Sequence, residues 1–192
     1  MTDLSLITLQ DTHKFRTDKG SRHFYLDIYD ELFKPYKHLS GYLLEIGVEW
    51  GGSLSLWDSY FEKMIIVGCD IARYLEHMPE SDRIKYILGD AYTTDTITQI
   101  STQYPKFNII IDDGPHSVIS QITTVTGYSP LIDVGLLIIE DVNRGELPHL
   151  LTNIHAELTQ SKRNYSLTTI DKNSSRRMSE HQDDTLVIIE FV

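Results

Sequence analysis

Two short apolar runs in this sequence are each followed by two acidic residues, and the first pair is followed by a histidine. The residues are Asp112, Asp113, His116, Glu140 and Asp141. Neighbouring strands of a sheet lie about 5 Å apart, so the ends of two parallel strands can bring Asp113, Glu140 and Asp141 together. Oxygen ligands alone select magnesium, calcium or manganese over zinc or copper. Acids gathered there without a cation would repel one another, which favours a metal or a cationic ligand at this place.

His116 lies three residues after Asp113, in an expected loop. Its ordinary pKa of about 6.5 suits the removal of a proton from a hydroxyl group at neutral pH. The alternative, that it caps or begins the next helix, stays open. Most of the other histidines have no comparable neighbours and are interpreted as surface residues.

A glycine-rich turn is expected where the first strand meets the first helix of the sheet. The segment Leu43 to Ser53 reads LLEIGVEWGGS, with the spacing Glu-x-Gly-x-x-x-Gly-Gly. Glycines at such a turn let a ligand approach the backbone closely. The spacing differs from the dinucleotide pattern Gly-x-Gly-x-x-Gly, whose helix N-terminus holds a pyrophosphate. The turn therefore favours a ligand without phosphate, with a nearby acid to bind a cationic amine.

Acidic residues also end the next two strands. Asp70 follows Gly47 by 23 residues, which suits hydrogen bonds to ribose hydroxyls. Asp90, followed by Ala91, is placed to meet an adenine amino group. Each acid alone could be a helix cap or a turn residue, but together with the acid of the glycine turn they outline an adenosine pocket.

The elements that position these residues alternate between strand and helix. The expected strands are Tyr42 to Ile46, Met64 to Cys69, Ile84 to Leu88, Phe107 to Ile111 and Gly135 to Ile139. The apolar helix faces are Leu54, Trp57, Tyr60 and Phe61, then Leu147, Leu150, Leu151, Ile154 and Leu158, with an N-terminal helix over about Phe24 to Phe33. Such alternation predicts a doubly wound α/β fold.

The alternation ends after the fifth strand. Tyr165 to Ile170 and Thr185 to Phe191 predict two further strands, joined by a polar loop, so the last strand is expected to be antiparallel. Arg176 and Arg177 in this loop are interpreted as solvated. The alternative is contact with an acidic or phosphorylated substrate such as a nucleotide sugar.

Composition narrows the class of protein. The chain has 192 residues and 22.1 kDa, 41% hydrophobic and 23% charged residues, and a net charge of -11. That charge disfavours nucleic acid and anionic membranes as partners. The single cysteine excludes an internal disulfide framework, and no apolar run approaches the roughly 20 residues of a membrane span. Because the start also lacks a signal-peptide pattern, we expect one soluble, cytoplasmic domain over residues 1–192.

Five motifs in the expected order carry a resemblance to a known family. They are LLEIGVEWGGS, GCDIA, GDA, IIIDDGPH and LLIIEDV. Together they resemble the class I S-adenosylmethionine-dependent methyltransferases. More narrowly, the chain is similar to the metal-dependent O-methyltransferases of macrolide sugars and to the related cephalosporin hydroxylase-like proteins. The segment Thr17-Asp18-Lys19-Gly20, with His23 and Tyr25, also matches that family.

The resemblance implies a Rossmann-like, seven-stranded, mostly parallel sheet with an antiparallel last strand. It implies that Asp113, Glu140 and Asp141 bind Mg²⁺ (or Mn²⁺ or Ca²⁺) and that His116 is the general base. The implied cofactor-binding residues are Thr17, Lys19, Tyr25, Glu45, Gly47, Gly51, Ser53, Asp70, Asp90, Ala91 and Asp112. It also implies that Asp112 faces the cofactor or supports the metal site. Residues 1–40 are expected to form an N-terminal lid and helix segment, in which Thr17 to Tyr25 closes over the cofactor.

Two features depart from the family. Pro115 stands where the family usually has a small residue, and it stiffens the loop of His116. The chain is also shorter than the macrolide enzymes, which have an additional N-terminal domain.

The sequence thus predicts methyl transfer from S-adenosylmethionine to a hydroxyl of a sugar or nucleotide sugar, with a homo-oligomer possible. The alternatives are a cofactor-binding domain without activity that serves a partner, and a nicotinamide-dependent oxidoreductase. A hydroxylase is disfavoured because the sequence offers no obvious iron triad of two histidines and one carboxylate.

Overall fold

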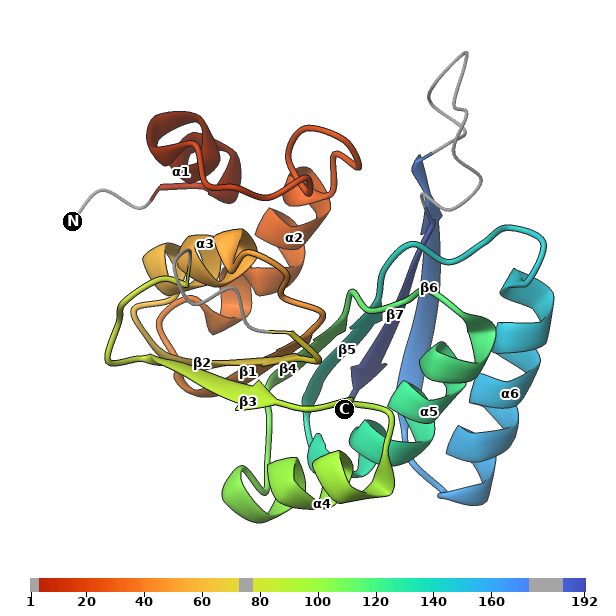
Figure 1. The fold of residues 1–192 in the computed structure, drawn as a ribbon. Helices are drawn as coiled ribbons and strands as arrows, with labels where there is room; N and C mark the ends of the chain where they lie inside the picture. The colour runs from red at the N-terminus through yellow and green to blue at the C-terminus, as the bar shows by residue number, and fades with distance from the viewer. Residues whose placement is uncertain (1–3, 73–77, 173–184) are drawn as a thin grey trace. The chain divides into compact units, whose positions relative to one another are not determined.

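The structure is a computed structural model that describes residues 4–72, 78–172 and 185–192. It divides into two compact units, Met1–Gly89 and Asp90–Val192, drawn in Figure 1. The single domain expected from the sequence stays a prediction. His77, Arg176, Arg177 and His181 lie outside the described residues.

The first unit contains three parallel strands and the helices that cover them. Its elements are α1 (Leu6–His13), α2 (Leu26–Phe33), the 3₁₀ helix η1 (Lys34–Tyr36), β1 (Ser40–Ile46), α3 (Gly52–Tyr60), β2 (Lys63–Asp70) and β3 (Ile84–Leu88). Strand β2 pairs with both β1 and β3, and Ile46 lies opposite Cys69. Because the strands are parallel, the glycine turn after β1 and Asp70 at the end of β2 lie at the same edge of the sheet.

The second unit contains four strands. Its elements are α4 (Thr94–Gln103), β4 (Ile109–Asp112), α5 (Val118–Tyr128), the 3₁₀ helix η3 (Ser129–Leu131), β5 (Gly135–Ile139), α6 (Leu147–Gln160), β6 (Tyr165–Asp171) and β7 (Thr185–Phe191). Strands β4 and β5 are parallel, with Asp112 opposite Ile139, so the acids that follow them emerge side by side. Strand β7 runs antiparallel to both β5 and β6.

All seven predicted strands are present. Their order is β3-β2-β1 in the first unit and β4-β5-β7-β6 in the second. This confirms the α/β class, the seven strands and the antiparallel last strand. Strand β4 starts at Ile109, two residues later than predicted, because the Phe107 amide donates a hydrogen bond to the Leu131 carbonyl. Helix α1 was not predicted, since it buries only Leu6 and Leu9 and has no long apolar stripe.

Aromatic rings join α2 to α3 in the first unit. The Trp57 ring lies 5.4 Å from the rings of both Tyr29 and Phe33, and Phe33 lies 5.3 Å from Phe61. All four side chains are buried, which confirms the apolar face predicted at Trp57 and Phe61. The N-terminal helix is also present, but it begins at Leu26, and Phe24 before it is exposed. Of the histidines interpreted as surface residues, His13, His38, His149 and His155 are exposed. No helix in the described part of the chain combines the length and apolarity that crossing a membrane requires.

The N-terminal segment lies directly against the start of α3. A Cβ atom on Gly52 would be 1.8 Å from the carbonyl oxygen of Arg16, and the Arg16 guanidinium lies 3.9 Å from the centre of the Trp50 ring. Glycine at position 52 is therefore what lets the backbone of the N-terminal segment reach the glycine turn.

Replacement of this glycine tests the contact. Because a backbone carbonyl cannot move aside as a side chain does, we expect Gly52→Ala to destabilise the protein by about 1–3 kcal/mol, measured by chemical denaturation. It should also speed hydrogen exchange in residues 15–25. The control is Gly127→Ala in α5, where the three atoms nearest to the added methyl group all belong to the Ile97 side chain. An unchanged stability for Gly52→Ala would contradict the close approach.

Candidate active site

The glycine turn after β1 has three residues with left-handed backbone. The φ angles are 81° at Gly47, 43° at Glu49 and 72° at Gly51. A Cβ atom on Gly51 would also lie 2.7 Å from the Pro79 side chain. The turn therefore requires glycine at position 51 for two reasons, one of conformation and one of space.

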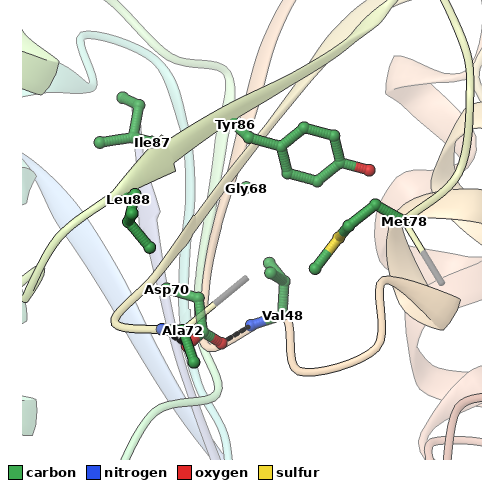
Figure 2. A pocket seen from close by; sticks show the side chains of 8 residues that line it. All are labelled: Val48, Gly68, Asp70, Ala72, Met78, Tyr86, Ile87 and Leu88. Carbon is green, nitrogen blue, oxygen red and sulfur yellow. Dashed lines mark hydrogen bonds between the residues drawn. The ribbon is translucent and has the colours of Figure 1, made fainter. Parts of the chain in front are cut away.

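Asp70 holds this turn in place. Its Oδ2 atom accepts hydrogen bonds of 2.9 Å from the amides of Val48 and Glu49, and its Oδ1 atom accepts one of 2.9 Å from the Ala72 amide, as Figure 2 shows in part. Asp70 thus organises the backbone between β1 and α3. Its contact with a ribose stays a prediction.

A small pocket adjoins Asp70 within the first unit (Figure 2). It is shallow and partly open to solvent, and it is lined by Val48, Gly68, Asp70, Ala72, Met78, Tyr86, Ile87 and Leu88. The lining is mostly apolar and has one carboxylate. Such a surface suits a flat, largely apolar group with a polar edge.

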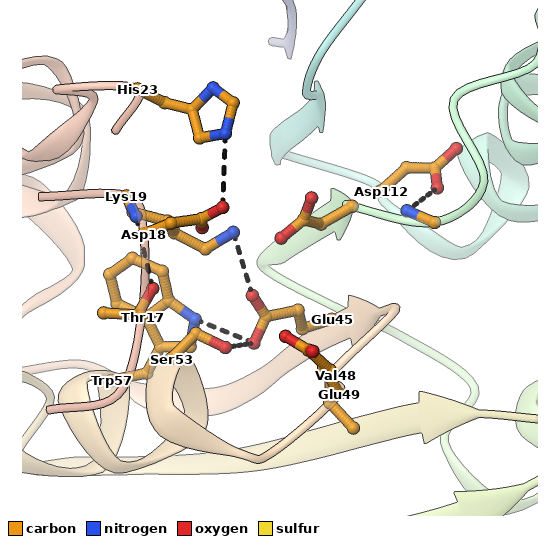
Figure 3. Close-up of polar contacts among 12 residues, drawn as sticks. Thr17, Asp18, Lys19, His23, Glu45, Val48, Glu49, Ser53, Trp57 and Asp112 are labelled. Atoms are coloured by element: carbon orange, nitrogen blue, oxygen red, sulfur yellow. Dashed lines mark hydrogen bonds and ion pairs between the residues drawn. The ribbon is translucent and has the colours of Figure 1, made fainter. Parts of the chain in front are cut away.

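Glu45, in β1, is completely buried, and its carboxylate is held by three side chains (Figure 3). The Oε2 atom accepts hydrogen bonds from the Ser53 hydroxyl at 2.7 Å and from the Trp57 indole at 3.1 Å. The Oε1 atom lies 3.4 Å from the ammonium group of Lys19, which is 1% exposed. The structure therefore brings together three predicted cofactor residues, Lys19, Glu45 and Ser53, and gives Lys19 a physical role as counter-charge.

The segment around Lys19 has its own polar contacts. The His23 Nε2 atom lies 3.2 Å from the Asp18 carboxylate. This hydrogen bond is the main cause that lowers the pKa of Asp18 to about 2. The pair therefore stabilises the fold at pH values above 3.8, the ordinary pKa of Asp18, and its contribution is lost as the pH falls toward 2.

Two other predicted cofactor residues lie in the same segment. Tyr25 is buried against His23, and the Thr17 hydroxyl accepts a hydrogen bond from the Lys19 amide at 3.4 Å. Cofactor contacts of Thr17 and Tyr25, and closure of the segment as a lid, stay predictions.

Asp90 and Ala91 begin the second unit. The exposed Asp90 accepts a hydrogen bond from the Tyr92 amide at 3.0 Å, and the carbonyl of the buried Ala91 accepts one from the Tyr128 hydroxyl at 2.6 Å. These bonds fix the turn that precedes α4. The predicted contacts with an adenine edge stay predictions.

Asp112, at the end of β4, is 2% exposed and accepts three hydrogen bonds. They come from the Tyr92 hydroxyl at 2.6 Å, the Thr124 hydroxyl at 2.5 Å and the Gly114 amide at 3.2 Å. Burial raises the pKa of Asp112, and the bonds from Thr124 and Tyr92 oppose that rise. Burial and the nearby Asp112 raise the pKa of Tyr92 as well, so its hydroxyl remains a donor.

Tyr92 and Thr124 were not predicted as site residues. The signal for Tyr92 is its place directly after the GDA motif, and the signal for Thr124 is a polar side chain on the buried face of α5. Neither is distinctive without the fold.

Asp113, His116 and Asp141 form a cluster beyond the ends of β4 and β5. One donor atom from each lies within 4.8 Å of the others. The His116 Nε2 atom is 3.8 Å from the Asp141 carboxylate and 4.0 Å from that of Asp113. His116 and Asp141 have left-handed backbones, with φ angles of 55° and 53°. Such strain in residues other than glycine is typical of functional sites.

Glu140 lies next to this cluster and is 1% exposed. Its amide donates a hydrogen bond to the Asp112 carbonyl at 2.9 Å. The predicted metal ligands are Asp113, Glu140 and Asp141. Among the described residues, the cluster whose donor atoms lie within 4.8 Å of one another contains His116 and not Glu140. A ligand role for Glu140 stays a prediction.

The Lys19–Glu45 pair gives a direct test of the buried charge. Because Lys19→Met leaves the Glu45 carboxylate without this cation, we expect a loss of about 3–5 kcal/mol in the free energy of unfolding. The double variant Lys19→Met/Glu45→Gln should regain much of that loss. The control is Lys106→Met, which removes an exposed pair with Asp133 and should cost at most about 1 kcal/mol. Equal losses for Lys19→Met and Lys106→Met would show that the buried pair is not important for stability.

No protein-family model matches this chain. It is 34% identical over 140 residues to demethylmacrocin O-methyltransferase of Streptomyces fradiae, and 36% identical over 131 residues to mycinamicin VI 2''-O-methyltransferase of Micromonospora griseorubida. These matches cover 68% and 64% of this chain but 35% and 32% of the relatives. The chain thus spans about a third of the length of these curated relatives.

Solved structures agree with the sequence matches. The MycE methyltransferase of the mycinamycin pathway, solved in complex with Mg and SAH, has a TM-score of 0.73 and 26% identity, covering 98% of this chain and 55% of that one. A putative caffeoyl-CoA O-methyltransferase from Staphylococcus aureus, at 14% identity and a TM-score of 0.58, shares the fold alone. The resemblance predicted from the motifs is therefore confirmed: the chain has the class I methyltransferase fold and is similar in sequence to the O-methyltransferases of macrolide sugars.

Proposed function

We propose that the protein is an S-adenosylmethionine-dependent, divalent-metal-dependent O-methyltransferase acting on a hydroxyl group of a sugar. The observation that carries this proposal is the cluster of Asp113, His116 and Asp141 beyond β4 and β5. The similarity to macrolide-sugar methyltransferases supports it.

The donor set of the cluster fits a hard divalent cation. Two carboxylates offer oxygen atoms within 4.8 Å of one another and of the His116 imidazole, and oxygen-rich sites favour Mg²⁺, Mn²⁺ or Ca²⁺. Asp113 and Asp141 would hold the ion, with Glu140 as the third ligand. When bound, the cation lowers the pKa of a hydroxyl group that it coordinates.

His116 is proposed as the general base. Its side chain is 34% exposed, so it is open to a substrate, and the carboxylates of Asp113 and Asp141 near its Nε2 atom stabilise the imidazolium after proton uptake. A ligand role would place the same nitrogen on the metal, and the variants below separate the two roles.

The first unit would bind the methyl donor. Gly47 and Gly51 allow close approach to the backbone, and Asp70 with the adjoining apolar pocket suits a nucleoside. The sulfonium supplies an already activated methyl group. The protein must therefore only bind the donor, accept the hydroxyl proton and hold the oxygen in line with the methyl carbon.

The relatives indicate the class of acceptor. MycE is also solved with Mg, SAH and mycinamycin VI, and another relative is an 8-demethyl-8-alpha-L-rhamnosyl tetracenomycin-C 2'-O-methyltransferase of Streptomyces olivaceus. We therefore propose that the acceptor is the sugar of a glycosylated small molecule. A nucleotide sugar is the alternative acceptor. The net charge of -11 makes a polyanion a poor partner.

Two variants test the roles in this site. We expect Asp113→Asn to weaken Mn²⁺ binding, measured by the paramagnetic resonance of free Mn²⁺, because it removes a charged ligand. We expect His116→Ala to lower methyl transfer by about 10²–10⁴-fold, followed with labelled S-adenosylmethionine and a glycosylated macrolide, while Mn²⁺ affinity is kept.

The matched controls are Asp133→Asn and His155→Ala, which change exposed residues that pair with Lys106 and Tyr165. Both should retain activity and metal affinity. Full activity of His116→Ala would remove His116 as the base, and a loss of Mn²⁺ binding in that variant would make it a ligand. Unchanged Mn²⁺ affinity in Asp113→Asn would remove Asp113 from the ligand set.

A further inference from the structure

Helix α5 buries polar side chains on the face that it turns toward β4 and β5. Gln121 is 1% exposed and Thr124 is completely buried. Burial of polar side chains is costly unless they form hydrogen bonds, and an apolar helix face would pack against strands without that cost. The two residues lie three positions apart, so they share one face of the helix.

Each of these side chains reaches the end of a different strand. The Thr124 hydroxyl donates a hydrogen bond of 2.5 Å to Asp112 in β4. The Gln121 amide group donates one of 3.4 Å to the carbonyl of Glu140, directly after β5. Asp113 follows Asp112 in the chain, and Asp141 follows Glu140. Helix α5 is therefore bonded to the residue before each of the two clustered carboxylates.

Tyr92 holds the same carboxylate through its other oxygen atom. Its hydroxyl donates a hydrogen bond of 2.6 Å to Asp112, whose Oδ1 atom also accepts the Gly114 amide. A Cβ atom on Gly114 would lie 1.9 Å from the Tyr92 hydroxyl oxygen, so the tyrosine occupies the space above this glycine. Tyr92 thus contacts the loop that begins at Asp113 and ends at His116.

We propose that Tyr92 and Thr124 are positioning residues for the metal centre, acting through Asp112. The two hydroxyls fix both carboxylate oxygens of Asp112, and this fixes the backbone from which the Asp113 carboxylate and the His116 loop project. The inference rests on the proposed metal-dependent function. Loss of either hydroxyl leaves Asp113 free to move away from Asp141, so the cation binds less tightly.

The alternative is that the two hydroxyls only satisfy a buried carboxylate. In that case their loss would lower stability and leave metal affinity unchanged. Metal affinity therefore separates a positioning role from a structural one, and it is measured without methyl donor or acceptor.

The experiment is a Mn²⁺ titration of the free protein, followed by paramagnetic resonance of unbound Mn²⁺, beside thermal unfolding of each variant. Tyr92→Phe and Thr124→Val keep the shape of the side chain and remove the hydroxyl. We expect each to weaken Mn²⁺ binding by about 10–100-fold. Thr124→Ser keeps the hydroxyl group and should therefore bind Mn²⁺ with the affinity of the wild type.

The matched controls are Tyr165→Phe in β6 and Thr126→Val on the exposed face of α5, whose hydroxyls bond to His155 and to the Thr123 carbonyl. Both should bind Mn²⁺ as the wild type does. Wild-type affinity in folded Tyr92→Phe and Thr124→Val would overturn the positioning role and leave the proposed function standing. Absence of Mn²⁺ binding by the wild type would overturn the metal-dependent function and this inference together.

Discussion

Burial of carboxylates at the ends of strands is the constraint on which this structure depends. A buried carboxylate is tolerated only where hydrogen bonds or a counter-charge replace the lost water. Glu45, at the end of β1, is held by an ammonium, a hydroxyl and an indole group. Asp112, at the end of β4, is held by two hydroxyls and a backbone amide. In each case the donors come from neighbouring segments, so the same bonds that stabilise the charge fix those segments in place.

The clustered acids Asp113 and Asp141 differ from these two because each faces another acid and an imidazole. The His116 Nε2 atom lies 4.0 Å from the Asp113 carboxylate and 3.8 Å from that of Asp141, and one donor atom of each residue lies within 4.8 Å of the others. Like charges at this separation favour a cation between them. His116 and Asp141 both have left-handed backbones at this place. We propose that the buried Asp112, held by Tyr92 and Thr124, fixes the backbone of the His116 loop.

The sequence predicts the fold well because strands such as β4 and β5 are buried along their whole length and leave continuous apolar runs. It also predicts the acids, since residues at strand ends are adjacent to those runs. It does not predict what each acid contacts. Lys19 matched a family segment without a physical reason, and its contact with Glu45 requires the packing of residues 26 positions apart. Tyr92 and Thr124 were not predicted because a single hydroxyl group, in a turn or on a helix, leaves no periodic pattern in the sequence. The cluster contains His116 in the place where adjacency alone suggested Glu140.

The most direct test of the central claim is calorimetric titration of S-adenosylhomocysteine into the protein, once with Mg²⁺ and once with EDTA. The residues proposed for the methyl donor, Gly47, Gly51 and Asp70, lie in the first unit, and the metal cluster lies in the second. The account therefore predicts saturable binding in both conditions. Absence of binding in both would contradict the assignment as a methyltransferase.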